Sequence, residues 1–187
     1  MAQSGSLSLS SLDAPETGAV LIEISIADQA LRVSTPGACH LFSVSTALNG
    51  AGEQMGSGKT PRGWHSVRAC IGAGLAENSV FVGRRPTGEL YSPELAAQFP
   101  ERDWILSRIL WLQGQEVGYN RLGQVDSMRR YIYIHGTPDS EPMGVARSHG
   151  CIRMRNSDML ALFELVKPGT PVWIQAHSFS RIPCRNL

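Results

Sequence analysis

The chain brings together the side chains that most often serve as nucleophile, base or metal ligand in proteins. His135 and Gly136 end the stretch YIYIHG, and His149 and Cys151 belong to SHGCIR. A histidine near a cysteine can lower the thiol pKa and accept its proton, so these residues could form an activated nucleophile. Gly150, between His149 and Cys151, allows a tight turn and a close approach of the backbone.

Two other roles are open for Cys151. A free cysteine is most often a small buried hydrophobic residue. It could also bind zinc with His135 and His149, which would supply the three protein ligands of a catalytic zinc site. Neither Cys-x-x-Cys nor His-x-x-x-His, the paired spacings of zinc sites, occurs in the sequence. The pattern therefore favours a nucleophile, with no metal.

A second motif, GSGKT at 56–60, resembles the end of a phosphate-binding loop. That motif requires a glycine five positions before the Gly-Lys pair, and Glu53 stands there. A carboxylate at this position would also repel phosphate. We therefore expect a surface loop and no nucleotide cofactor.

Alternating, β-branched segments separated by turn residues indicate a mainly β domain that must position these groups. Strands are expected at 20–26, 30–33, 40–46, 64–71, 79–83, 104–112, 131–136 and 171–176. The glycine-rich segment 49–63 is expected to be a loop, and 84–103 mostly loop with a helical turn near 94–98. One helix is predicted at 157–166, with Asn156 or Ser157 as its cap.

Length and composition indicate one globular domain. The 187 residues carry a formal net charge of +1, far from the basic balance of a nucleic-acid binder. No run of eighteen apolar residues is present, so no membrane span is expected. We interpret 1–18 as a flexible N-terminal segment, 19–176 as the domain and 177–187 as a C-terminal tail.

The N-terminal segment and the cysteines indicate in which cellular compartment the protein works. The first basic residue is Arg32, so the sequence as given shows no export signal. The four cysteines, at positions 39, 70, 151 and 184, lack the dense spacing of a disulfide scaffold. Free thiols and a cytoplasmic location are the expectation, and a periplasmic location is the alternative if the N-terminus is trimmed.

The motifs together resemble the L,D-transpeptidase catalytic domain, also called the YkuD domain. IHGTP followed by RSHGCIRMRNSD is similar to the signature of that family, and GSGKTPRGWHSV is similar to its upstream TPxGxF segment, with Trp64 at the aromatic position. The resemblance covers roughly 19–176. Two departures are a short spacer, 136–147, and Arg153, which stands where many members have asparagine.

The resemblance implies a β-sandwich-like fold with a short helix after the cysteine, and an acyl transfer on peptidoglycan stem peptides. Cys151 would attack the carbonyl between the L-centre of meso-diaminopimelate and D-alanine, and release D-alanine. The resulting thioester would pass to an amine, which forms a cross-link, or to water, which leaves a tripeptide. Carbapenems would acylate the same thiol.

The resemblance also suggests a role for each residue of the motif. His135 would be the general base, oriented by the backbone carbonyl of Gly136. The N–H groups of Gly150 and Cys151 would form the oxyanion hole, supported by His149.

Four further residues near the cysteine are expected to contact the substrate. Arginines suit the carboxylates of a stem peptide, and the serine belongs to the signature itself. These residues are Arg147, Ser148, Arg153 and Arg155.

A cytoplasmic member of this family would meet soluble muropeptides and would use water as its main acceptor. We therefore expect L,D-carboxypeptidase hydrolysis in wall recycling, with cross-linking transpeptidation as the alternative. A non-catalytic binding module would not need Cys151 and His135. Stem peptides are the only partners expected, with neither nucleic acid nor membrane, and the sequence predicts no oligomeric state.

Overall fold

The computed structural model describes residues 19–180, so the segment 1–18 and the last residues of the tail, 181–187, lie outside the described part. The strands are β1 (Leu21–Ser25), β2 (Ala30–Thr35), β3 (Ala38–Ser43), β4 (Gly63–Ile71), β5 (Ser79–Val82), β6 (Arg85–Leu90), β7 (Ile105–Gly114), β8 (Tyr133–Thr137), β9 (Ile152–Arg155) and β10 (Pro171–Gln175). The helices are α1 (Pro93–Gln98), α2 (Asn156–Leu165) and the 3-10 turn Gly123–Val125.

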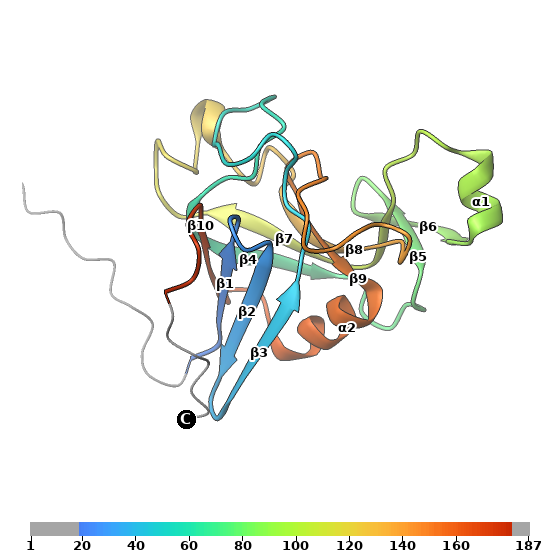
Figure 1. The fold of residues 1–187 in the computed structure, drawn as a ribbon, viewed down its shortest axis with the longest axis horizontal. Coiled ribbons are helices and arrows are strands. Elements are labelled where there is room, and N and C mark those ends of the chain that lie inside the picture. Colours follow the sequence, from blue (N-terminus) through green and yellow to red (C-terminus); the bar gives the residue numbers. More distant parts are fainter. Residues whose placement is uncertain (1–18, 181–187) are drawn as a thin grey trace, which may run out of the picture.

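The strands form one curled sheet in the order β3-β2-β1-β10-β4-β7-β5-β6, and β7 also pairs with β8, which pairs with β9. The pairs β1–β10 and β8–β9 are parallel. The sheet wraps around the core together with α2, while β5, β6 and α1 extend from it as a separate lobe (Figure 1). The expectation of a mainly β domain with a short helix after the cysteine is confirmed.

Strand alternation separates the core from the face that carries the chemistry. On β8, Ile134 is fully buried in the main core cluster, and on β9 Ile152 and Met154 join it. The intervening residues, His135 on β8 and Arg153 on β9, therefore point to the opposite face of the sheet. The pattern of apolar residues in these strands thus orients the reactive side chains.

Three elements differ from the sequence prediction. The strand β6 lies in a segment predicted to be loop, because Pro86 and Gly88 look like breakers. It pairs with β5 alone, and an edge strand tolerates proline. The strand β9 directly follows the cysteine and was not predicted. The strand β8 begins later than expected, because Tyr131 takes a left-handed conformation with φ of 56°.

The start of α2 also differs, because Arg155 is its N-cap and no side chain caps it. The buried Asn156 side chain instead accepts from Ser107 Oγ at 2.7 Å and donates to Asn78 at 2.8 Å. It sits against Gly136, where a Cβ would clash with its Oδ1. Gly136 is thus required so that α2 can be anchored behind the site.

The prediction of free thiols is wrong at one cysteine. Cys39, on β3, is disulfide-bonded. Cys70 and Cys151 are free and half-buried, and Cys184 lies outside the described residues.

Within residues 19–180, none of the helices is both long and apolar enough to cross a membrane.

His65 gives the fold a predictable dependence on pH. Its buried ring bonds the carbonyl of Gly63 at 3.0 Å and the hydroxyl of Ser127 at 2.9 Å. Burial lowers the pKa of His65 from 6.5 to about 4. The unfolded chain therefore binds this proton more tightly, and stability is full above pH 6.5 and falls as the pH drops towards 4. We expect the free energy of unfolding to fall by roughly 3 kcal/mol between pH 6.5 and pH 4.

The measurement is urea unfolding of wild type and His65→Gln at several pH values. His65→Gln should be less stable at pH 7 but should lose less between pH 6.5 and 4. His40→Gln, at an exposed position on β3, serves as the control. If the free energy of unfolding fell equally with pH in wild type and in His65→Gln, His65 would not be the source of the pH dependence.

Candidate active site

The two central strands of the site bring the predicted nucleophile and the predicted base onto one face. In the parallel β8–β9 pair, Ile134 lies opposite Ile152 and His135 lies opposite Arg153. Cys151, one residue before β9, therefore lies on the same face as His135 and packs against the cluster formed around Tyr133. The signature residues, sixteen positions apart in the sequence, become neighbours on adjacent strands.

His135 is held in the tautomer that a general base needs. Its ring is buried, and Nδ1 donates to the carbonyl of Gly136 at 2.8 Å. Since a carbonyl only accepts, Nδ1 carries the proton and the lone pair of Nε2 is left for the base. Burial lowers the pKa of His135, so the ring is neutral at pH 7. The contact to Gly136 that the family resemblance implies is present.

The thiol of Cys151 is protonated in the resting site. Its Sγ donates to the carbonyl of Tyr131 at 3.4 Å. Burial raises the pKa of the Cys151 thiol to about 11, against the opposing effects of a main-chain hydrogen bond from Tyr133 and the charges of Arg153 and Arg130. The free site therefore holds a neutral thiol and a neutral imidazole.

The turn that carries Cys151 is locked by its own serine. Ser148 Oγ donates to the carbonyl of Cys151 at 2.5 Å and accepts from the N–H of Gly150 at 3.2 Å. Gly150 has a φ of 136°, in the region that favours glycine. The buried Ser148 therefore shapes the turn, and the Gly150 N–H is occupied, unlike its expected role as an oxyanion donor. Within residues 19–180 the Cys151 N–H has no hydrogen-bond partner, so it remains available to an oxyanion.

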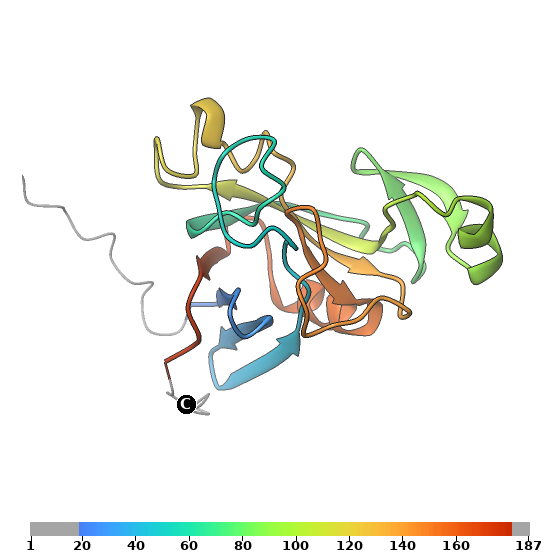
Figure 2. The same cartoon turned by 45° about the horizontal axis from the view of Figure 1, so that its top comes forward.

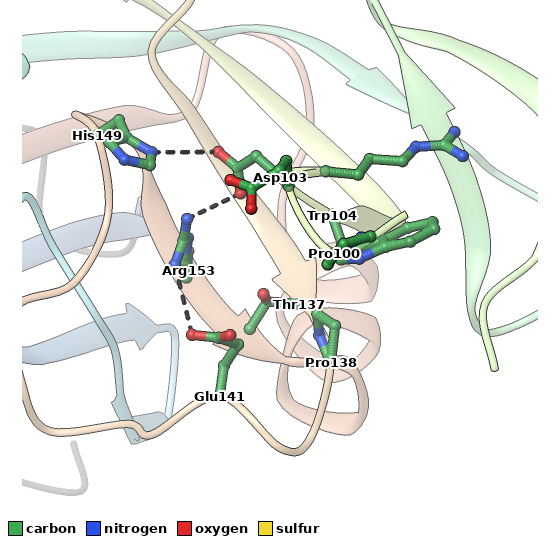
Figure 3. Close-up of a pocket in the computed structure, with 10 residues that line it drawn as sticks. Pro100, Asp103, Trp104, Thr137, Pro138, Glu141, His149 and Arg153 are labelled. Carbon is green, nitrogen blue, oxygen red and sulfur yellow. Dashed lines mark hydrogen bonds and ion pairs between the residues drawn. The ribbon is translucent and has the colours of Figure 1, made fainter. Parts of the chain in front are cut away.

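A charged pocket of about 180 Å³ is lined by His149 and Arg153, which flank Cys151 in the sequence. Asp103 bridges two of the predicted residues, with Arg153 at 2.8 Å and His149 Nδ1 at 3.5 Å, and Glu141 lies 3.6 Å from Arg153 (Figure 3). The side chain of His149 is 82% exposed, whereas that of Arg153 is only 9% exposed. Two carboxylates thus neutralise Arg153, and its Nε is buried without a partner.

Comparison with known proteins identifies the family. Residues 19–174 match the model of the L,D-transpeptidase catalytic domain. The chain belongs to this family. A segment of 43 residues, 23% of the chain and 14% of its relative, is 49% identical to the Escherichia coli K12 protein described as "Probable L,D-transpeptidase YbiS".

Solved L,D-transpeptidases share the fold at low sequence identity. An L,D-transpeptidase from Mycobacterium smegmatis matches with a TM-score of 0.51 at 20% identity, covering 84% of this chain and 58% of that one. L,D-transpeptidase 3 from Mycobacterium tuberculosis, in complex with a faropenem-derived adduct, matches with a TM-score of 0.52 at 18% identity, covering 84% and 60%. The chain thus spans less than two thirds of the length of these relatives.

Two arginines predicted to contact the substrate do not line this pocket of the L,D-transpeptidase domain. Arg155 is exposed and donates to the carbonyl of Asp139 at 3.1 Å. Arg147 is exposed, and its main-chain N–H bonds the carbonyl of Thr46. Neither lines the pocket beside Cys151, which Arg153 does line.

The sequence prediction missed Arg130, which holds the loop 49–62 near the turn that carries Cys151. Its guanidinium donates to the carbonyls of Gly52, Glu53 and Lys59 at 3.1, 2.8 and 2.5 Å. Its charge also lowers the pKa of Cys151. No local motif marks this arginine, because the partners of its guanidinium come from a loop more than seventy residues earlier.

That loop, 49–62, lies against the nucleophile turn and against the segment 115–130 (Figure 2). The buried hydroxyl of Thr60 donates to the carbonyl of Gly150 at 3.0 Å. Glu53, which excluded a phosphate-binding loop, pairs with Arg62 at 2.7 Å. The expected surface loop therefore packs against the turn that carries Cys151.

A second missed feature is an aromatic rim around Arg84 on the other side of the cysteine. Its guanidinium lies 4.5 Å from the ring centroid of Trp111 and 4.8 Å from that of Tyr131. It also donates to the hydroxyl of Tyr133 at 2.8 Å. Cys151 packs against Trp111 and Tyr133 of this rim.

Proposed function

We propose that this domain catalyses cysteine-dependent acyl transfer at the bond between diaminopimelate and D-alanine of peptidoglycan stem tetrapeptides. The observation that carries this proposal is the placement of Cys151 on the same sheet face as a buried His135 whose Nδ1 is fixed by the carbonyl of Gly136. Membership of the L,D-transpeptidase family supports a peptidoglycan substrate.

The reaction follows from the groups on this face. As Sγ of Cys151 attacks the carbonyl carbon, Nε2 of His135 takes the thiol proton. The Cys151 N–H stabilises the oxyanion, a contribution of about 3 kcal/mol for one such donor. When the tetrahedral intermediate collapses, the C–N bond breaks and the imidazolium returns its proton to the amine of D-alanine. A thioester on Cys151 remains.

The acidic pocket favours an amine as the second substrate. Asp103 and Glu141 together carry two negative charges against the single charge of Arg153. An acceptor with both an ammonium and a carboxylate, such as the D-centre of diaminopimelate, fits this mixture of charges. We therefore propose transfer of the thioester to an amine, in place of the hydrolysis expected from the sequence.

The disulfide at Cys39 also supports transfer to an amine over hydrolysis. Disulfides persist in oxidising compartments and are rare in the cytoplasm. The cytoplasmic expectation rested in part on free thiols, and that part no longer holds. We propose that the domain works outside the cytoplasm, where the cross-linked polymer is found.

Product analysis tests this proposal. With a disaccharide tetrapeptide at millimolar concentration, we expect cross-linked dimer to form faster than tripeptide. Asp103→Asn should lower the dimer-to-tripeptide ratio about tenfold, because it removes a charge-assisted contact to the ammonium group. Mass spectrometry of the products measures both species.

Glu94→Gln, on α1 and outside the pocket, is the matched control for Asp103→Asn. It should leave the ratio unchanged. Tripeptide as the main product of wild type would restore the hydrolytic assignment and leave the nucleophile and the scissile bond as proposed.

A further inference from the structure

A second cavity, of about 300 Å³, opens where β10 ends, beside the residues that lead into β4. Two aromatic side chains, Tyr119 and Trp173, line it together with the polar residues Arg62, Gln175 and His177. None of these residues takes part in the acyl transfer described above. The combination of aromatic surface and hydrogen-bonding groups around it is that of a ligand site.

Both aromatic side chains are held by their neighbours. The indole N–H of Trp173 donates to Gln175 Oε1 at 3.1 Å, and the ring lies 5.0 Å from that of Trp64. The guanidinium of Arg62 lies 6.0 Å from the ring centroid of Tyr119. These contacts fix the rings before a ligand arrives, which reduces the entropy lost on binding.

The loop 49–62 contacts the turn that carries Cys151 and also lines the cavity. Thr60 bonds the carbonyl of Gly150, next to the nucleophile, whereas Arg62 lines the cavity. Two residues of extended chain span at most about 7 Å, so the same loop forms a wall of both sites. A polymer bound at the cysteine could therefore extend into the cavity.

The charged side chains around the cavity indicate which class of ligand it can bind. Glu53 neutralises Arg62 at 2.7 Å, and Glu116 adds a carboxylate, so the cavity does not suit an anion. Its polar rim is equally unsuited to a purely apolar ligand, which would leave these groups without hydrogen bonds. A neutral ring with an apolar face and polar edges fits both conditions.

We propose that this cavity binds a pyranose ring of the glycan strand to which the stem peptide is attached. The C–H face of the sugar packs on Trp173 or Tyr119, and its hydroxyl and acetamido groups bond the polar rim. The cavity lies at the small end of the volume range in which proteins bind organic ligands, which suits one sugar ring. The identity of the sugar rests on the proposed function.

Binding without catalysis is the first test. Full-length Cys151→Ala protein is titrated with tri-N-acetylchitotriose by calorimetry, and we expect saturable binding. Trp173→Ala and Tyr119→Ala, each in that background, should weaken it about tenfold or more, because a stacked aromatic contact is lost. Phe99→Ala, an exposed aromatic residue in the lobe, is the matched control. No binding, or equal binding by all variants, would overturn the proposal.

Turnover is the second test, and it separates this inference from the proposed function. Wild type should use disaccharide tetrapeptide with a higher kcat/KM than free tetrapeptide. Tyr119→Ala should remove that preference and leave turnover of free tetrapeptide unchanged. If neither substrate is turned over, the proposed function fails while the calorimetry still decides the saccharide site. An undiminished preference in Tyr119→Ala and Trp173→Ala would reject the site.

Discussion

Cys151→Ala is expected to reduce turnover of a stem tetrapeptide by roughly 10⁴-fold or more, because the covalent route disappears with the nucleophile. The thiol is half-buried against the cluster around Tyr133, so alanine should preserve the fold. Release of D-alanine measures the rate, and thermal unfolding verifies that the variant is folded. Activity within tenfold of wild type would refute the assignment.

Acylation by a carbapenem gives an independent readout of the same residue. We expect one adduct in the intact mass of wild type and none in Cys151→Ala, because the strained lactam carbonyl meets the same thiol and oxyanion donor. Cys70→Ala is the control, since Cys70 is also free and half-buried. An adduct that persists in Cys151→Ala would place the nucleophile elsewhere.

The second large effect should come from His135. His135→Ala is expected to lower kcat/KM by about 10²–10⁴-fold, the usual loss when a general base is removed. His149→Ala should cost less, because that side chain is 82% exposed and its contact to Asp103 is 3.5 Å long. Both variants are compared with wild type in the D-alanine assay and in carbapenem acylation.

The reverse order of effects would exchange the roles of the two histidines. Treatment with a chelator should leave the rate unchanged. Rate loss on chelation, restored by added zinc, would revive the metal interpretation of Cys151, His135 and His149.

The sequence predicted the centre of the site because that centre is local. The positions of Cys151 and of the histidine at the end of an alternating strand can be predicted from the residues next to them in the sequence. Strand periodicity then places the side chains of His135 and the core residue Ile134 on opposite faces of the sheet, as the structure confirms. The helix at 157–166 was found for the same reason, apart from its cap.

The surroundings of the site could not be predicted, because they depend on partners distant in the sequence. Asp103 pairs with Arg153, which lies fifty residues later in the sequence. Because of this pair, the arginine that was predicted to bind a substrate carboxylate is part of an acidic pocket. The disulfide at Cys39 is equally invisible to spacing rules. Predicting β6 and β9 required knowledge of which strands they border.

The contacts of Arg130 have a consequence for how this enzyme can diversify. Its strongest hydrogen bonds go to main-chain carbonyls, those of Gly52, Glu53 and Lys59, which every amino acid possesses. At Gly52, Glu53 and Lys59 the path of the loop 49–62 is therefore held through main-chain groups. Substitutions of the exposed side chains Gln54 and Met55 should leave that path unchanged, in contrast to substitutions of Thr60, whose side chain bonds the carbonyl of Gly150. The loop is thus a natural place to alter substrate preference without redesigning the catalytic centre.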